Sequence, residues 1–205
     1  MATVSRIDGL SPVKFITGAP YNGAGTWYFI PAANTDVMMV GDVVKLAGDG
    51  RAATGYQTIA RHAGGATEAA VGVILGFPKT GVGDLNNLPA VDNLNTANYR
   101  ASGVATYALV ADDPTLVFEA QTSGGTLAAT QFGLNAGIGV AAGNTANGAS
   151  GMTIDLASAA TTATLPLKII GTPNRPDNTV GDPFTRAYVL INNHQYKGGT
   201  GTAGI

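Results

Sequence analysis

The stretch from residue 107 to residue 121 reads YALVADDPTLVFEAQ, in which two apolar runs flank the tripeptide Asp112-Asp113-Pro114. The second run alternates, as a half-buried strand requires, because side chains of successive strand residues point to opposite faces. Its two faces are Leu116, Phe118 and Ala120 on one side and Thr115, Val117 and Glu119 on the other. The stretch therefore predicts two consecutive strands joined by a short break.

The break itself fits a structural turn, either a hairpin or a corner. Asp side chains accept hydrogen bonds from nearby backbone N–H groups, and Pro114 fixes φ near the value that a turn corner needs. A calcium site would need further oxygen ligands at fixed spacing, and none follows Asp112. A catalytic carboxylate pair is the third interpretation, but adjacent strand residues face opposite ways. We therefore expect Asp112, Asp113 and Pro114 to form a turn and predict no metal ligand or catalytic residue here.

The composition of the whole chain favours an all-β protein. Its 205 residues include 29 Gly and 10 Pro, and only Glu68 and Glu119 are glutamates. Glycine and proline punctuate turns, whereas glutamate favours helix interiors. We predict a β-barrel or jelly-roll-like body with extended N- and C-terminal arms and long Gly/Asn-rich loops. The sequence shows no clean internal repeat.

The same totals narrow the class of partner. The net charge is −2 and only 12% of residues are charged, so no basic surface for nucleic acid is expected. No apolar run is long enough for a membrane span. The absence of cysteine excludes disulfides and a cysteine zinc site. With no apolar signal core in residues 1–15, we expect synthesis in a host cytoplasm.

The chain divides into an arm, a body and a tail. Residues 1–25 read as an N-terminal arm, 26–192 as a single β domain and 193–205 as a C-terminal tail. Long loops are predicted at 78–98, 122–150 and 172–183, where Gly, Asn, Ala or Pro cluster. Strands are predicted near 26–31, 42–47, 70–77, 104–110, 115–121, 152–158, 163–170 and 186–192.

Motifs for enzyme chemistry are nearly absent, so we predict no enzyme and no cofactor. His62 and His194 are the only histidines, and no G-x-S-x-G elbow accompanies them. No phosphate-binding glycine motif is present. The aromatic triplet at residues 27–29 fits either the two faces of a barrel wall or a stacking platform for sugars or bases. Arg100 and Arg175 stand alone in the sequence.

Several segments together resemble a family of tailed-phage virion proteins, the capsid decoration, cement or head-stabilisation proteins. The likeness spans about residues 38–196, and YALVADDPTLVFEAQ carries most of it. The other segments are VGDVVKLAGDG, VGVILGF, ATLPLKIIG, RPDNTVGD and YVLINNHQY. The resemblance implies a β body on the outer surface of an icosahedral shell, where it bridges major capsid proteins and stabilises the head.

The resemblance also implies the partners. These are the major capsid protein and further copies of the chain itself, as a trimer in preference to a dimer, with the virion as the location. Three alternatives stay open: another virion component such as a tail or fibre-attachment module, a carbohydrate-binding β-sandwich that uses Trp27, and a hydrolase on a β scaffold.

The arms carry scattered apolar residues, although they lack a periodic apolar face. Such a segment gains little from ordering alone, whereas each large side chain buried on a neighbour returns about 1.5–3 kcal/mol. We therefore predict that the arms contact other subunits or the capsid. The candidate contact residues are Val4, Ile7, Leu10, Phe15, Tyr196 and Ile205.

Overall fold

The computed structural model describes residues 3–78, 99–199 and 201–205, and strands make up almost all of its regular structure. The helical structure within these ranges is one 3-10 turn, Ala129–Gln131. The all-β prediction is confirmed. Within the described ranges no helix has the length and apolar character to cross a bilayer. The loop predicted at 78–98 lies, apart from Pro78, outside the described residues.

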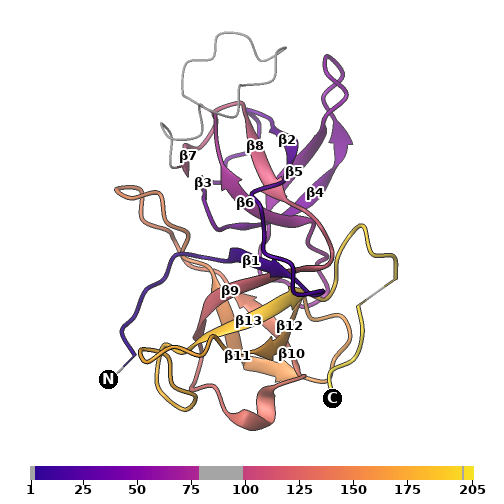
Figure 1. The fold of residues 1–205 in the computed structure, drawn as a ribbon. Helices are drawn as coiled ribbons and strands as arrows, with labels where there is room; N and C mark the ends of the chain where they lie inside the picture. The colour runs from indigo at the N-terminus through magenta and orange to yellow at the C-terminus, as the bar shows by residue number, and fades with distance from the viewer. Residues whose placement is uncertain (1–2, 79–98, 200) are drawn as a thin grey trace.

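Five strands close into a first barrel in the order β2–β5–β4–β6–β8, which forms the upper part of Figure 1. Their bounds are β2 (Thr26–Ile30), β4 (Val43–Gly50), β5 (Gln57–Arg61), β6 (Gly72–Gly76) and β8 (Thr106–Ala111). The two short strands β3 (Met38–Met39) and β7 (Tyr99–Arg100) pair with each other. The barrel predicted from the sequence is therefore present.

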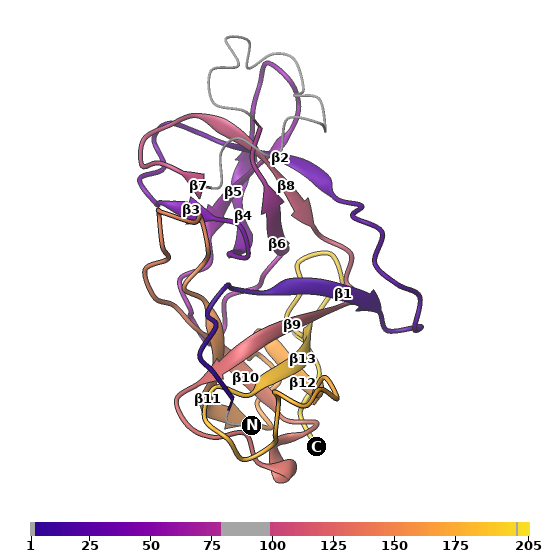
Figure 2. The same cartoon turned by 60° about the vertical axis from the view of Figure 1, so that its left-hand side comes forward.

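A second set of strands forms the lower part of Figure 1, in the order β1–β9–β11–β10–β12–β13. β13 also pairs with β9, so the five strands from β9 to β13 close into a second ring. Their bounds are β1 (Ser11–Phe15), β9 (Leu116–Ser123), β10 (Asn135–Gly139), β11 (Thr153–Ala160), β12 (Leu167–Gly171) and β13 (Arg186–Ile191). Figures 1 and 2 both show β1 lying between the two parts of the molecule.

The interior of the second ring follows the alternation of its strands. One side of each strand contributes to a single buried apolar cluster. The members are Leu116, Phe118 and Ala120 of β9, Ala136 and Ile138 of β10, Ile154 and Leu156 of β11, Leu167 and Ile169 of β12, and Ala187, Val189 and Ile191 of β13. The alternation predicted for 115–121 is thus confirmed, and it places Glu119 on the outer face.

The two rings share one topology. In the first ring, the first strand (β2) runs parallel to the third (β5), and the other four pairings are antiparallel. In the second ring, β9 runs parallel to β11, and again the other four pairings are antiparallel. The strands pair in the same sequential order in both. The chain is therefore a tandem repeat of a five-stranded barrel.

Local geometry repeats along with the topology. Before β4, Gly41 has φ +90° and donates its N–H to the carbonyl of Ile74 at 2.9 Å. Before β10, Gly133 has φ +88° and donates its N–H to the carbonyl of Ile169 at 2.8 Å. Glycine suits both places because a left-handed conformation strains any side chain. The equivalence places Ile74 on Ile169.

With this equivalence, short sequence matches emerge that the sequence alone did not reveal. TYALVA (106–111) aligns with TRAYVL (185–190), and QTI (57–59) aligns with MTI (152–154). VILG (73–76) aligns with KIIG (168–171), and both strands bulge just before the final glycine. The interpretation that the chain has no internal repeat was wrong. Closure of a barrel constrains the register of its strands and the volume of its interior. Different residues can satisfy both constraints, so the two repeats share little sequence identity.

The first barrel packs on the second through the outer wall of β4, β6 and β8. Val43 pairs with Val73, and Val73 pairs with Ala111, so the three side chains lie side by side on this wall. All three are fully buried and belong to the same apolar cluster as the interior of the second barrel. This continuity joins the two barrels into one packed body.

The equivalent wall of the second barrel is polar and is covered by the end of the chain. Asn135, Lys168 and Leu190 stand in register there. The Nδ2 of Asn135 donates to the carbonyl of Thr202 at 2.7 Å, and the Nζ of Lys168 donates to the carbonyl of Ala203 at 2.8 Å. The repeat has therefore diverged, with an apolar wall where barrel meets barrel and a polar wall under the chain end.

Three predicted boundaries need correction. The loop predicted at 122–150 contains β10. The sequence did not indicate this strand because it holds glycines in place of the β-branched residues that are typical of strands. The close packing requires these glycines, since a Cβ on Gly137 would contact Ser158 and a Cβ on Gly139 would contact Thr153. The predicted arm 1–25 contains β1, which pairs with β9. The predicted tail begins with residues 193–197, which bind back to the first barrel. Residues 172–183 hold no strand, only a bridge between Arg175 and Asn178.

Candidate functional site

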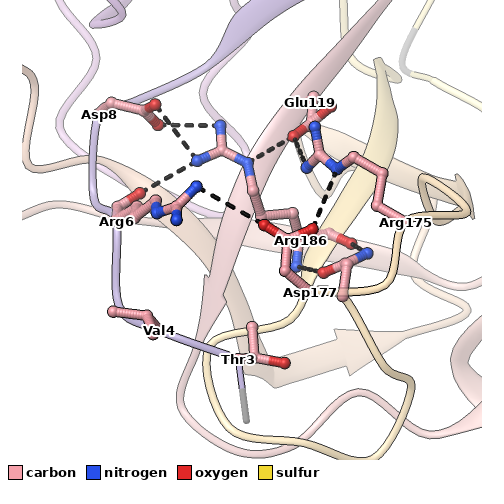
Figure 3. A pocket seen from close by; sticks show the side chains of 9 residues that line it. Thr3, Val4, Arg6, Asp8, Glu119, Arg175, Asp177 and Arg186 are labelled. Atoms are coloured by element: carbon pink, nitrogen blue, oxygen red, sulfur yellow. Dashed lines mark hydrogen bonds and ion pairs between the residues drawn. The ribbon is translucent and has the colours of Figure 1, made fainter. Parts of the chain in front are cut away.

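The N-terminal segment crosses the second barrel over a polar cavity of about 250 Å³. Six charged residues line it, together with Thr3, Val4 and Asn178 (Figure 3). We call the six the ionic clasp: Arg6, Asp8, Glu119, Arg175, Asp177 and Arg186. They are six of the chain's 24 charged residues (11 basic and 13 acidic), so a charge-poor chain concentrates a quarter of its charge here.

Glu119 and Arg186 form the centre of the clasp because they lie on neighbouring strands and face outward. Arg186 Nε lies 2.6 Å from Glu119 Oε1, and Arg175 Nη2 contacts the same oxygen at 2.6 Å. Both central side chains are mostly buried. The hydrogen bond from Arg175 to Glu119 raises the pKa of the guanidinium, so it stays charged throughout the usual pH range. Glu119 thus accepts hydrogen bonds from two guanidinium groups, which come from two different segments of the chain.

The rest of the clasp holds the N-terminal segment. The guanidinium of Arg186 binds both carboxylate oxygens of Asp8, at 3.0 and 3.2 Å, a bidentate geometry. It also donates to the carbonyl of Arg6 at 3.1 Å. Arg6 in turn lies 3.6 Å from Asp177, and its backbone N–H donates to Gln121. The clasp therefore fixes residues 3–8 across β9 and β13.

The charges of the clasp are balanced, three guanidinium groups against three carboxylates, and every carboxylate has a cationic partner. The cavity is lined by neither a histidine nor a serine. A network in which every carboxylate is paired with a guanidinium fixes the segment that carries Arg6 and Asp8. Within residues 3–78, 99–199 and 201–205, no three His, Asp or Glu side chains are placed to hold a metal ion.

The clasp leaves apolar side chains on the outside of the segment it holds. Val4 is 65% exposed and Ile7 is 45% exposed. The neighbouring loop adds Val180 and Phe184, which are also exposed, and Thr3 ties the two segments by donating to Asp182 at 3.2 Å. Phe184 has φ +65°, a conformation that costs a bulky residue roughly 1–3 kcal/mol. We call Val4, Ile7, Val180 and Phe184 the clasp surface.

The other predicted contact residues divide into buried and exposed ones. Leu10 is 1% exposed and lies in the chain's own core, so its prediction as an intermolecular contact was wrong. Phe15 packs partly against the same core. The Tyr196 hydroxyl donates to Gln57 at 2.5 Å and lies 2.9 Å from the hydroxyl of Tyr28. Ile205 is 91% exposed, although its N–H binds the carbonyl of Gly133.

The tripeptide at 112–114 is a corner between the barrels and not a hairpin. It joins β8 of the first barrel to β9 of the second, so its flanking strands do not pair. Asp113 Oδ1 accepts from the N–H of Thr115 at 2.7 Å and from its hydroxyl at 2.6 Å. These bonds lower the pKa of Asp113. Asp112 Oδ2 accepts from the hydroxyl of Tyr28 at 2.8 Å.

This geometry predicts a modest effect of Asp113→Ala. The substitution removes two hydrogen bonds on a surface corner, so the free energy of unfolding should fall by about 0.5–1.5 kcal/mol. Asp113→Asn keeps an acceptor oxygen and should lose less. Urea titrations of the three proteins measure both values, and EDTA should leave each midpoint unchanged. A large fall in midpoint on adding EDTA would restore the metal interpretation.

Two arginines that stand alone in the sequence have partners in the fold. Arg175 belongs to the clasp, and Arg100 is 2% exposed. Arg100 donates to the carbonyls of Asp36, Asn34 and Val104 at 2.6 to 2.7 Å. Its role is to fold the loop before β3, since a buried guanidinium persists only where acceptors surround it. The interpretation of these residues as isolated was wrong.

Both histidines and most of the aromatic triplet are buried and packed within the chain itself. His62 and His194 are buried. Tyr28 points into the first barrel, while Phe29 packs at a tilt against Tyr107 on the other face of the wall, with ring centroids 5.4 Å apart. The triplet therefore contributes to both faces of the barrel wall. Sequence reasoning missed the clasp because its members come from four separate segments; the sequence marks only that Glu119 lies on the outer face of β9.

In comparisons with known proteins, no family model, curated protein or solved structure matches the chain.

Proposed function

We propose that this chain is a non-enzymatic virion protein that binds the outer surface of a phage capsid, bridges major capsid proteins and stabilises the head. The sequence resemblance from about residue 38 to 196 is what suggests the capsid. The observation that carries the binding surface is the clasp, which uses paired charges to present Val4 and Ile7 to solvent. Exposed apolar side chains beside charged and polar ones are typical of protein interaction sites.

The physical basis of the proposal is preorganisation. A free arm would lose about 1–2 kcal/mol of backbone entropy per residue on ordering at a shell. Here β1 and the clasp already order residues 3–15 in the isolated chain. More of the interface free energy then remains for stabilising the shell. Many equivalent copies on a symmetric shell add their contacts as avidity. Self-association, as a trimer, belongs to the same proposal.

The test is binding to shells of the encoding virus that were assembled without the protein. The double substitution Val4→Ser, Ile7→Ser removes two exposed apolar side chains and should cost roughly 2 kcal/mol of binding free energy. That corresponds to roughly a 30-fold weaker Kd. The urea midpoint should stay unchanged, because neither side chain contributes to the core.

Ile16→Ser is the matched control, since Ile16 is also well exposed but lies beyond β1 and away from the clasp. Its affinity should equal that of the wild type. Equal binding by the double variant would place the contact surface elsewhere on the barrels. Failure of the wild-type protein to bind shells at all would contradict the proposed function itself.

A further inference from the structure

The segment that follows β13 fastens the second barrel to the first. Ala70 donates its N–H to the carbonyl of Asn193 and accepts from the N–H of Gln195, both at 2.9 Å. The Gln195 side-chain oxygen accepts from the N–H of Leu46 at 2.7 Å. Tyr196 reaches Gln57 and Tyr28 on the first barrel. We call residues 193–197 the C-terminal clamp.

His194 lies at the centre of the clamp with its ring buried. Nδ1 accepts the N–H of Tyr196 at 3.0 Å, so the neutral ring carries its proton on Nε2. Nε2 is buried and has no hydrogen-bond partner within the described residues. A second proton can enter only at Nδ1, where the Tyr196 N–H already points. Protonation of the closed clamp would therefore set two donors against each other in a buried site.

His62 provides an internal comparison, because it makes the same local bond. Its Nδ1 accepts the N–H of Gly64 at 3.0 Å, and its Nε2 contacts the carbonyl of Glu68 at 3.0 Å. The difference is a carboxylate: Glu68 Oε2 lies 3.2 Å from Nδ1 of His62, and its charge opposes the larger effect of burial, which lowers the pKa of this ring too. Within the described chain, no carboxylate lies within ion-pair distance of Nδ1 of His194, which accepts the N–H of Tyr196.

We propose that the C-terminal clamp is a pH-sensitive latch, in which a proton on Nδ1 of His194 breaks the Tyr196 bond and releases the clamp from the first barrel. Release frees Tyr196 from Gln57 and Tyr28, and Gln195 from Leu46 and Ala70. The latch joins two barrels whose apolar contact continues beneath it, so the body stays folded while the clamp opens. This inference is independent of shell binding.

The electrostatic surroundings of His194 set the direction of the response. Burial is the dominant influence and lowers the pKa of the ring from 6.5; Asp112 and Asp113 oppose this effect, and Lys197 adds to it. The ring of Tyr196 lies 5.9 Å away. The closed clamp thus resists a proton that the open clamp accepts. Its stability is fully present above pH 6.5 and falls as the pH drops below that value.

The test is hydrogen exchange of the full-length chain, followed at the amides of Leu46 and Gln195. If the open clamp binds a proton with a pKa near 6.5 and the closed clamp does not, protection should fall by about 30-fold between pH 7.5 and pH 5. This expectation applies after correction for the intrinsic pH dependence of exchange. Amides of β10 and β11, inside the second barrel, should keep their protection.

The matched variants are His194→Asn and His62→Asn. The Asn Oδ1 takes the place of Nδ1 as acceptor for the N–H two residues on, and it does not titrate. His194→Asn should abolish the pH dependence at the clamp, whereas His62→Asn should retain it. A wild-type clamp equally protected at both pH values overturns the proposal, as does a His194→Asn variant that loses protection like the wild type.

A direct titration keeps the proposal testable if the His194 variant fails to fold. With only two histidines, the ring C–H resonances of the wild-type protein can each be followed by NMR. The proposal expects the His194 ring to become protonated over the same pH range in which the Leu46 and Gln195 amides lose protection. Protonation of His194 while both amides remain protected would overturn it.

Discussion

Val73→Lys is expected to destabilise the protein severely, by about 3–5 kcal/mol, because it places an unpaired ammonium group in an apolar contact. Val73 is fully buried between Val43 and Ala111 on the wall that packs against the second barrel. The equivalent residue of the second barrel is already a lysine, Lys168, whose Nζ reaches the carbonyl of Ala203. The substitution thus gives the first barrel a wall residue of the second.

The matched control is Lys168→Val, which removes one exposed hydrogen bond and should change the free energy of unfolding by less than about 1 kcal/mol. Guanidinium titrations of both variants, followed by far-UV circular dichroism, provide the comparison. A single transition is expected for the wild type because the outer wall of the first barrel packs into the apolar core of the second. A Val73→Lys variant as stable as the control would show that the wall of the first barrel is not a packed interface.

Asp42→Ala should have the second-largest effect, again about 3–5 kcal/mol, because it leaves a mostly buried guanidinium without its anion. Asp42 is fully buried just before β4. It accepts from Arg61 Nε at 2.9 Å, from the Met39 N–H at 2.9 Å and from the Ser150 hydroxyl at 2.5 Å. Ser150 belongs to the connection between β10 and β11, so this carboxylate also joins the barrels.

A double-mutant cycle separates the ion pair from the rest of the Asp42 network. Arg61→Leu alone should also destabilise, since it leaves a buried carboxylate. Asp42→Ala combined with Arg61→Leu should be less destabilised than the sum of the single changes, with a coupling energy of roughly 1–3 kcal/mol. Additive effects in urea titrations would mean that the Arg61 contact contributes little and that the Met39 and Ser150 bonds dominate.

The sequence predicted correctly those features that depend on the residues of a single segment. The alternation in 115–121 predicted both the strand and its buried face, because burial follows a period of two along a single segment. The tripeptide at 112–114 predicted a turn from the local chemistry of Asp and Pro. Whether that turn closes a hairpin or crosses between barrels depends on which strands pair, and that depends on contacts far apart in the chain.

The tandem repeat and the clasp could not be predicted from the sequence, because both depend on contacts between residues far apart in the chain. The repeat is a match of register between two closed rings, and it leaves only matches such as TYALVA with TRAYVL in the sequence. The clasp brings together Arg6, Glu119 and Arg186, which lie more than 60 positions apart in the sequence. Leu10 was taken for a partner contact because its arm lacks periodicity, yet the second barrel, which the same chain supplies, buries it.

The proposed capsid role is tested most directly by quantitative mass spectrometry of purified phage particles whose genome encodes the chain. A shell-bridging protein should be present in a fixed copy number that is a multiple of a class of symmetry sites on the shell, and it should remain with DNA-filled heads after the tails are removed. Absence from the particle, or a copy number that follows the tail fraction in place of the head fraction, would contradict the account.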